Sequence, residues 1–384
     1  MVTIAGRKSL SHQQTPNTQI PVAVDAMGGD HGPSVVVEGA VIAARELGIR
    51  SIVVGNQQEI EPALVRLGAT NLPELKILHT SEVLTMEDSP SAVLRRKKEA
   101  SVRVAFELTK SGEACGVVSP GNTGGMMAAG LFVSGTLPGI VRPAIASLIP
   151  RGGDLPPTVL LDSGANIDCK AQQLIQFALM GSCYARSATG RDKPRVGILS
   201  NGSEASKGND ITRAAYVALK QLPAVDFIGY VEGRDICRDV ADVIVCDGFV
   251  GNIVLKTIEG AVELVVDNIR HHVSKTWRGK IGLLLAKKGF RSLFREKLDP
   301  SHYGGAPLLG LNHVGVVCHG SSSSRAIYNA IRGARKFADQ NLIGELKSTL
   351  SLLDLDLDAD YQNGVWRRLG DRFDNSEKKK GDKV

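Results

Sequence analysis

The sequence has no closely paired cysteines, no long apolar run and no acidic residue near its start. Its six cysteines form no CxxC pair, which argues against a zinc ribbon or a disulfide framework and favours a reducing cytosol. No run of eighteen apolar residues exists, so we expect no membrane-spanning segment. Residues 1–20 lack the apolar core of a secretory signal. We expect them to be a disordered N-terminal extension, with an organelle transit fragment as the alternative.

Several motifs that identify common enzyme classes are also missing. There is no GxSxG elbow of a serine hydrolase, no HExxH zinc motif and no GxGxxG dinucleotide fingerprint. Segment 202–207 lacks both the glycine before the lysine and the following hydroxyl residue of a Walker A loop. His271 and His272 are adjacent, so on a helix they point in different directions and offer no transition-metal site. We expect no metal, no organic cofactor and no nucleic-acid partner.

Short apolar runs and helical patterns alternate along the 384 residues of the chain. Seven runs have the length and composition of buried strands: Val22–Val24, Ile52–Val54, Cys115–Val118, Val159–Leu161, Val196–Leu199, Val243–Cys246 and Val314–Cys318. Four segments carry apolar residues three and four positions apart, the period of a helix with one buried stripe: Val35–Leu47, Met126–Val133, Gln172–Arg186 and Ala214–Leu222. This alternation predicts an α/β fold with a largely parallel sheet.

Glycine-rich loops follow several of the predicted strands. The turn Ser119–Gly125 leads from a strand into a helix, and the free N–H groups and dipole of a helix N-terminus favour a phosphate group. Four further loops pair glycine with Asp, Asn or Ser: 25–32, 162–166, 247–252 and 319–324. Helix capping and ordinary turn chemistry are the alternative for any one loop. Because ligands of parallel sheets bind beyond the carboxyl ends of the strands, the recurrence predicts an anion site there.

One lysine stands out among these loops. Lys207 follows the predicted strand Val196–Leu199 after a short turn, which places it near the carboxyl edge of the sheet. A lysine there would meet a bound phosphate as a mobile point charge. An ordinary exposed surface lysine is the alternative.

The chain closely resembles the bacterial family of acyl-ACP:phosphate acyltransferases from about Pro21 to Ala338. The segments that carry the resemblance are Val24–Asp30, Pro120–Gly124, Gly164–Asn166, Ser206–Asn209, Val231–Asp235, Cys246–Asn252 and Tyr303–Gly310. Two positions depart from the family pattern: the stretch 200–204, where the family more often has an Asn-Ile-Gly-Glu-Glu-like sequence, and Ser163, where valine is common. Both departures concern the pocket wall beside Lys207.

The resemblance implies a fold similar to that of isocitrate and isopropylmalate dehydrogenases, with helices on both faces of the sheet, and a homodimer. It implies transfer of a long acyl chain from acyl carrier protein to inorganic phosphate, with a downstream glycerol-3-phosphate acyltransferase receiving the acyl phosphate. Phosphate itself attacks the thioester in such a reaction, so no protein nucleophile is required. This agrees with the absence of a serine elbow.

The matching motifs also imply roles for individual residues. Lys207 and Asn252 are the expected catalytic residues, as a cation and as an amide donor. The residues expected to bind phosphate are Asn122, Thr123, Gly124, His319 and Ser321, and for the last two helix capping is the alternative. The residues expected to line the substrate pocket are Asp25, Asn166 and Asp247.

A basic segment follows a long helical stripe. Residues 275–297 hold eight Lys or Arg against one acid, interleaved with large apolar side chains, a composition that suits an anionic membrane surface. We expect a protruding basic amphipathic helical pair at 253–300, and the family is similar in this respect. The residues expected to contact a membrane or the carrier protein are Trp277, Lys280, Leu284, Lys287, Phe290, Arg291 and Phe294. A helical pair that only forms the dimer, with a solvated basic rim, is the third interpretation.

The expected organisation is an α/β acyltransferase domain at 21–338 and a C-terminal extension at 339–384 whose end is disordered. The expected location is the cytoplasm, with peripheral attachment to the membrane. Other functions compatible with the sequence are a short-chain phosphotransacylase that uses acyl-CoA, a hydroxyacid dehydrogenase, and a non-catalytic scaffold recruited to the membrane. The acyl chain length is not evident from one sequence.

Overall fold

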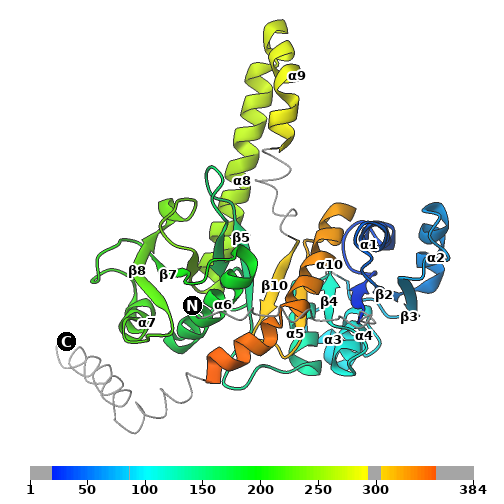
Figure 1. Ribbon diagram of the computed structural model, residues 1–384, viewed down its shortest axis with the longest axis horizontal. Coiled ribbons are helices and arrows are strands. Elements are labelled where there is room, and N and C mark those ends of the chain that lie inside the picture. The colour runs from blue at the N-terminus through cyan, green and yellow to red at the C-terminus, as the bar shows by residue number, and fades with distance from the viewer. Residues whose placement is uncertain (1–19, 86, 293–303, 352–384) are drawn as a thin grey trace, which may run out of the picture.

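Eleven strands form one sheet in the computed structural model, which describes residues 20–85, 87–292 and 304–351 (Figure 1). Their order across the sheet is β3 (Leu75–His79), β2 (Ser51–Gly55), β1 (Val22–Asp25), β4 (Gly116–Ser119), β11 (Val314–Val317), β10 (Ala306–Leu309), β5 (Ala144–Ile149), β6 (Thr158–Leu161), β9 (Val243–Val245), β7 (Arg195–Ser200) and β8 (Asp226–Glu232). Seven of the ten strand pairs are parallel. The predicted α/β fold with a largely parallel sheet is therefore confirmed.

The parallel strands fall into two sets that run in opposite directions. One set runs from β3 to β11 and the other from β6 to β8, and the antiparallel strands β10 and β5 lie between them. The carboxyl ends of the two sets consequently point to opposite edges of the sheet. The loops that the sequence marked as candidates therefore do not gather at a single edge.

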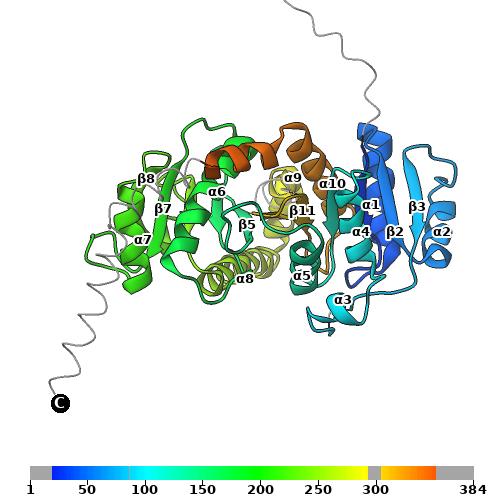
Figure 2. The same ribbon diagram turned by 90° about the horizontal axis from the view of Figure 1, so that it is seen from below.

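Helices cover both faces of the sheet (Figure 2). Alternate residues of β1 show the reason, since Val22 and Val24 belong to one core cluster and Ala23 to the other. The first cluster includes residues of α1 (Pro33–Leu47), α6 (Ala171–Thr189), α7 (Asp210–Lys220) and α10 (Ser324–Asp339), and the second includes α4 (Ser101–Lys110) and α5 (Thr123–Val133). The short helices α2 (Gln57–Arg66), α3 (Ala92–Arg95) and η1 (Gly233–Asp235) complete the body.

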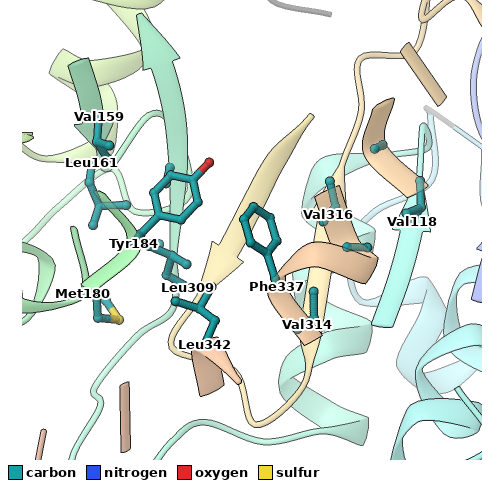
Figure 3. Close-up of a cluster of buried hydrophobic side chains, with 14 of the residues drawn as sticks. Val118, Val159, Leu161, Met180, Tyr184, Leu309, Val314, Val316, Phe337 and Leu342 are labelled. Atoms are coloured by element: carbon teal, nitrogen blue, oxygen red, sulfur yellow. The ribbon is translucent and has the colours of Figure 1, made fainter. Parts of the chain in front are cut away.

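Aromatic packing joins α6 to α10 in the larger cluster (Figure 3). The rings of Tyr184 and Phe337 meet edge to face at 5.5 Å between centroids. Beyond α10 the residues 342–351 are helical, and Leu342, Leu346 and Leu350 are buried in the same cluster at helical spacing. The first part of the expected C-terminal extension thus packs against the body. Residues 352–384 and 1–19 lie outside the described part of the chain.

Two long helices project from the body (Figure 1). These are α8 (Gly248–Val273) and α9 (Trp277–Ser292), and within α8 the buried positions are Gly248 and Gly251 at its base. Trp277 and Leu284 of α9 are 67% and 68% exposed. Among the described residues no helix has the length and apolar character needed to cross a membrane. The side chains of Lys287, Phe290, Arg291 and Phe294, which the sequence predicts to contact a membrane or the carrier protein, lie outside the described set, and residues 293–303 are outside it altogether.

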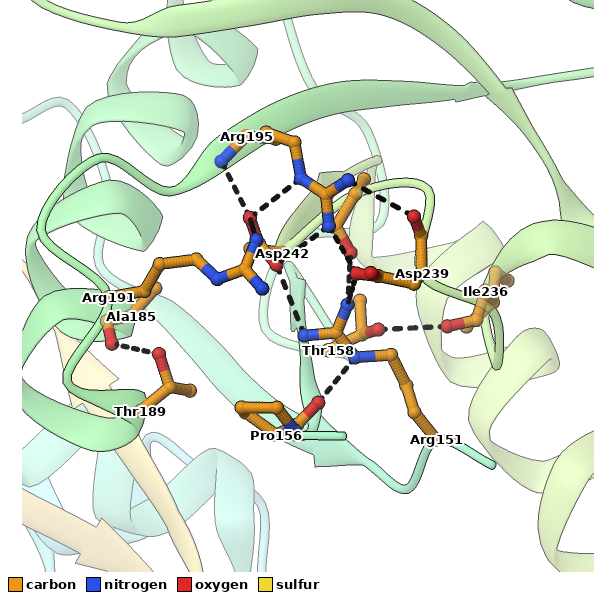
Figure 4. Close-up of polar contacts among 11 residues, drawn as sticks. Arg151, Pro156, Thr158, Ala185, Thr189, Arg191, Arg195, Ile236, Asp239 and Asp242 are labelled. Carbon is orange, nitrogen blue, oxygen red and sulfur yellow. Dashed lines mark hydrogen bonds and ion pairs between the residues drawn. The ribbon is translucent and has the colours of Figure 1, made fainter. Parts of the chain in front are cut away.

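An ion-pair network ties together the strands at the far end of the sheet (Figure 4). Asp242 accepts from Arg151 at 3.1 Å and is also paired with Arg191 and Arg195, and the side chains of Asp242 and Arg151 are each 1% exposed. Asp239 pairs with Arg151 and Arg195 at the rim of the network, where its side chain is 45% exposed. The network joins the residue before β9 to the start of β7 and the segment after β5.

Candidate active site

A cavity of about 450 Å³ lies at the centre of the sheet, where the two strand sets meet. Its floor is formed by β5 and by the start of β10, and its walls by the loops after β4, β6 and β11 and by one face of α8. Because β10 and β5 separate the two sets, this is where loops from opposite halves of the sheet approach one another.

Two helices begin at this cavity. Thr123 at the start of α5 lines it, as do Ser322 and Ala326 at the start of α10. Both helices are capped by side chains, since Gly125 N donates to Asn122 Oδ1 at 2.9 Å and Ala326 N donates to Ser323 Oγ at 3.3 Å. Each helix dipole places about half a positive charge at its N-terminus. The cavity therefore has a polarity that favours an anion.

The turn before α5 is held from behind by a buried carboxylate. Asp25, which is 3% exposed, accepts hydrogen bonds of 2.6 Å from Ser101 Oγ and Ser119 Oγ, and Ser119 Oγ in turn accepts from Gly121 N at 3.2 Å. Burial raises the pKa of Asp25, and the hydrogen bonds from the two serines oppose this rise. A Cβ at Gly28 would lie 2.6 Å from Gly121 N, so this position requires glycine. Asp25 supports the turn and is not among the cavity-lining residues.

The predicted phosphate-binding residues separate into two groups. Thr123 and His319 line the cavity. Asn122 caps α5 and also donates from Nδ2 to the carbonyl of Asp88 at 3.1 Å, while a Cβ at Gly124 would lie 2.8 Å from the Pro90 side chain. Both therefore contact the loop before α3 and shape the turn, instead of lining the cavity.

His319 and Ser321 form a pair after β11. Ser321 N donates to His319 Nδ1 at 3.2 Å, and the Ser321 hydroxyl lies 2.8 Å from the same nitrogen. Since Nδ1 accepts the backbone N–H, the neutral ring carries its proton on Nε2. The arrangement makes His319 a hydrogen-bond donor at the cavity wall, with Ser321 orienting it.

The opposite wall is built around a second buried carboxylate. Asp162, fully buried, accepts from the backbone N–H groups of Ile145, Gly164, Ala165 and Asn166 at 2.7 to 3.2 Å. Burial raises the pKa of Asp162, and these hydrogen bonds oppose the rise. They fix the loop after β6 as one edge of the cavity.

Asn166 and the first turn of α8 hold this loop in place. Asn166 is 8% exposed and donates from Nδ2 to Asp162 Oδ2 at 2.9 Å and to the Pro143 carbonyl at 2.8 Å. A Cβ at Gly251 would lie 1.9 Å from the Asp162 carbonyl oxygen, so the first turn of α8 sits directly against the loop. Asn166 is thus part of the support of the wall and does not line the cavity.

Asn252 is the predicted catalytic residue that faces the cavity. It lies on the first turn of α8, and a Cβ at Gly164 would be 3.6 Å from its Cβ and Cγ atoms. Within the described residues its side-chain amide has no hydrogen-bond partner, which leaves an N–H donor free for a ligand. The neighbouring Ser163, at one of the two departures from the family pattern, satisfies its hydroxyl by donating to the Ile145 carbonyl at 3.0 Å.

Lys207 and Asp247 lie elsewhere. Lys207 is exposed in the loop between β7 and α7, and it lines neither this cavity nor a second one of about 440 Å³ on the other side of the α8 base. Asp247 caps α8 by accepting from Val250 N at 2.8 Å and lines the second cavity. The loop after β7 opens at the same sheet edge as the loop after β6, but β9 lies between these two strands, so Lys207 lies further along that edge from the cavity.

Sequence reasoning missed two charged residues of the cavity, Lys256 and Glu259. Lys256 lies four residues after Asn252, and Glu259 lies three residues after Lys256, so all three share one face of α8. This helical spacing, taken with the prediction for Asn252, was the signal that would have identified them.

The fold is similar to that of solved phosphotransacylases. A phosphotransacetylase from Streptococcus pyogenes aligns with a TM-score of 0.55 and 20% identity, over 83% of this chain and 94% of that structure. A branched-chain phosphotransacylase from Enterococcus faecalis V583 aligns with a TM-score of 0.52 and 15% identity, over 83% and 99%. At these identities the likeness establishes the α/β fold alone. The expected likeness to isocitrate and isopropylmalate dehydrogenases stays a prediction.

Sequence comparisons define the class and the family. A family model described as "Fatty acid synthesis protein" matches residues 20–345. The phosphate acyltransferase of Syntrophotalea carbinolica is 48% identical over 344 residues, covering 90% of this chain and 98% of the relative, and that of Geotalea uraniireducens is 50% identical over 323 residues, covering 84% and 91%. The protein is an acyltransferase. The chain belongs to the bacterial phosphate acyltransferase family.

Proposed function

We propose that this protein transfers a long-chain fatty acyl group from acyl carrier protein to inorganic phosphate, which yields acyl phosphate for phospholipid synthesis. The observation that carries the proposal is the central cavity, where two capped helix N-termini meet the free amide of Asn252. The names of the relatives and of the matching family support both the phosphate acceptor and the fatty acyl donor.

The reaction proceeds by direct attack of phosphate on the thioester. A phosphate oxygen forms a bond to the carbonyl carbon, the carbonyl electron pair moves onto oxygen, and collapse of this intermediate breaks the carbon–sulfur bond. The carrier leaves as a thiolate and takes up a proton. The protein's task is to hold the dianion against the carbonyl and to stabilise the developing oxyanion.

The cavity residues suit these tasks. Thr123, the N-termini of α5 and α10 and the Nε2–H of His319 would hold phosphate, and Asn252 would donate to the oxyanion. Asn122, Gly124 and Ser321 would contribute by shaping the turn and orienting His319. Asp25, Asn166 and Asp247 would keep the pocket walls in place.

Phosphate-dependent release of free thiol from acyl carrier protein tests the proposal, run across acyl chain lengths and against acetyl-CoA at equal concentration. We expect release with long-chain acyl carrier and little with acetyl-CoA. The fold's likeness to phosphotransacetylases makes a short-chain phosphotransacylase the second candidate, and the reverse preference would establish it. No thiol release above the uncatalysed rate from either donor would contradict both candidates and favour the non-catalytic scaffold, and NAD binding would favour the dehydrogenase.

Lys207 lies outside the central cavity, so its proposed role of offsetting transition-state charge would act from a distance, and its removal tests that role. Replacing Lys207 by alanine should lower kcat/KM for acyl-phosphate formation by more than about threefold, which corresponds to roughly 0.6 kcal/mol. Lys193, an exposed lysine of the same half of the sheet, is the matched control. A Lys207→Ala enzyme within threefold of wild type would reduce Lys207 to a surface lysine.

The α8–α9 pair is proposed to be a basic amphipathic surface that contacts the membrane. Its exposed large apolar residues Trp277, Ile281, Leu284 and Leu285 are accompanied by Lys275, Arg278 and Lys280. Contact with an anionic surface would keep the protein cytoplasmic but peripherally attached, and would shorten the path of acyl phosphate to a membrane-bound glycerol-3-phosphate acyltransferase. Docking of the acidic carrier protein and formation of the homodimer are the competing uses.

Vesicle flotation tests the membrane role against the two competing uses. The wild-type protein should float with anionic vesicles at low salt and lose binding as salt screens the attraction. The double variant Lys275→Glu, Lys280→Glu should bind markedly less, whereas Lys193→Glu, Lys220→Glu on the body should bind as wild type does. Equal binding of both double variants, or no binding of the wild type, would remove the membrane role.

A further inference from the structure

The central cavity carries one lysine and one glutamate on the same face of α8. Lys256 and Glu259 both line it, and apart from His319 and the thiol of Cys318 they are its only ionisable side chains within the described residues. Lys256 Nζ lies 2.7 Å from Glu259 Oε2. The side chains are 52% and 31% exposed, so both remain accessible from the cavity mouth.

Helix stability does not explain this pair. An exposed ion pair three residues apart adds little to the stability of a helix. The order is also the less favourable one, because the cation precedes the acid along the helix. The position of the pair against the cavity, on the same face as Asn252, is its more informative property.

A phosphate dianion in this cavity needs a full positive charge nearby. The helix N-termini supply partial charges, and Thr123, Ser322 and the Nε2–H of His319 supply neutral donors. Lys207 lies outside the cavity, which leaves Lys256 as its full cation among the described residues. In the present arrangement Glu259 neutralises that cation.

We propose that Lys256 is the phosphate-binding cation of this cavity and that Glu259 holds its ammonium group until phosphate displaces the carboxylate. The inference rests on the proposed function, because it takes phosphate as the anion that enters. Phosphate and Glu259 compete for one ammonium group, so removing either side chain shifts the affinity for phosphate in a defined and opposite direction.

Steady-state kinetics with phosphate and acyl carrier varied separately test this competition. Lys256→Met should raise the KM for phosphate about tenfold or more, equivalent to about 1.4 kcal/mol, and leave the KM for acyl carrier unchanged. Glu259→Gln should lower the KM for phosphate about threefold, because the ammonium is then free. Both side chains are partly exposed, so the variants should fold.

The same helix offers a matched control. Asp267 and Arg270 form an ion pair at the same spacing of three, at 3.9 Å, away from the cavity. Asp267→Asn and Arg270→Met should leave the KM for phosphate at its wild-type value. A KM for phosphate that also stays unchanged in Lys256→Met and Glu259→Gln would overturn the proposal. So would a rise only in the KM for acyl carrier, since Lys256 would then contact the carrier substrate and not inorganic phosphate.

Thermal unfolding with inorganic phosphate alone gives a readout that does not depend on turnover. A ligand that binds only the folded state raises Tm according to its concentration over Kd. The rise should be smaller in Lys256→Met and larger in Glu259→Gln than in wild type. If the rise in Tm follows this order among the three proteins but wild type shows no phosphate-dependent thiol release, the proposed function fails while the assignment of Lys256 stands. If wild type turns over and all three proteins show the same rise, the assignment fails alone.

Discussion

Replacing Asn252 by alanine is expected to lower kcat about 100-fold or more while leaving the KM for phosphate within about twofold of wild type. The reason is that the amide faces the cavity without a hydrogen-bond partner among the described residues. The first turn of α8, directly before Asn252, packs tightly against the Asp162 loop. A donor held in this way costs no reorganisation when the oxyanion forms, and loss of one such donor is worth about 2.7–4 kcal/mol.

Two further variants sharpen the Asn252 test. Asn252→Asp keeps the shape but replaces the donor by an acceptor, so it should be at least as slow as Asn252→Ala. Asn268 is the matched control, because it is an exposed asparagine on the same helix whose Nδ2 already donates to the Leu264 carbonyl at 2.8 Å. Single-turnover measurements should give the same rate for the chemical step in Asn268→Ala as in wild type. A kcat for Asn252→Ala within threefold of wild type would remove Asn252 from the proposed mechanism.

Replacing Asp242 by alanine is expected to lower the free energy of unfolding by about 3–5 kcal/mol. The change leaves Arg151, whose side chain is 1% exposed, without its buried partner, and it also removes a contact of Arg191 and of Arg195 (Figure 4). Arg151 then keeps only its pair with the partly exposed Asp239, and a buried charge that loses its buried counter-ion costs far more than a lost surface pair. Urea denaturation measures the difference.

Asp239 provides the control for Asp242 within the same network. Its carboxylate is 45% exposed and pairs with Arg151 and Arg195, so Asp239→Ala should lower the free energy of unfolding far less than Asp242→Ala does. Equal losses of unfolding free energy in Asp239→Ala and Asp242→Ala would contradict the view that burial of the carboxylate decides how much stability is lost. The cavity and the network lie in different parts of the sheet, so Asp239→Ala should retain activity.

The network also gives a pH dependence. Hydrogen bonding from Arg195 lowers the pKa of Asp239 below its ordinary 3.8, and at Asp242 burial acts to raise the pKa but the arginine hydrogen bonds outweigh it. A lowered pKa means that the contribution to stability is present above the unfolded value and is lost as pH falls through the folded value. The acid limb of the stability curve should therefore be shallower in Asp242→Ala than in wild type.

Much of the architecture was predictable because it depends on local periodicity. All seven predicted strands are present, and the predicted helix Gln172–Arg186 lies within α6. The strands β3, β5, β8 and β10 were not identified as strands. In β5 the run Ala144–Ile149 contains Ser147, which faces Ser163 across the cavity floor, and such polar positions break the signature of a fully buried strand.

The candidate site was predictable only in part, for a different reason. Thr123, Asn252 and His319 were identified from glycine-rich loop motifs, and all three line the central cavity. Asn122, Asp25 and Asn166 belong to the same motifs, but their side chains are occupied with backbone groups and serines behind the cavity. Motif membership does not reveal which side of a loop a side chain occupies.

The sequence by itself determined the alternation of strands and helices, the anion-favouring turn at Ser119–Gly125 and the family, because these depend on residue type and spacing along the chain. Only the tertiary structure decided which loops meet. The loops after β4, β6 and β11 meet at one cavity beside the antiparallel strands β10 and β5, whereas β9 separates β7, and with it the loop of Lys207, from β6. The tertiary structure also sets Lys256 and Glu259 against that cavity, beside segments far from them in the sequence, which no local pattern specifies.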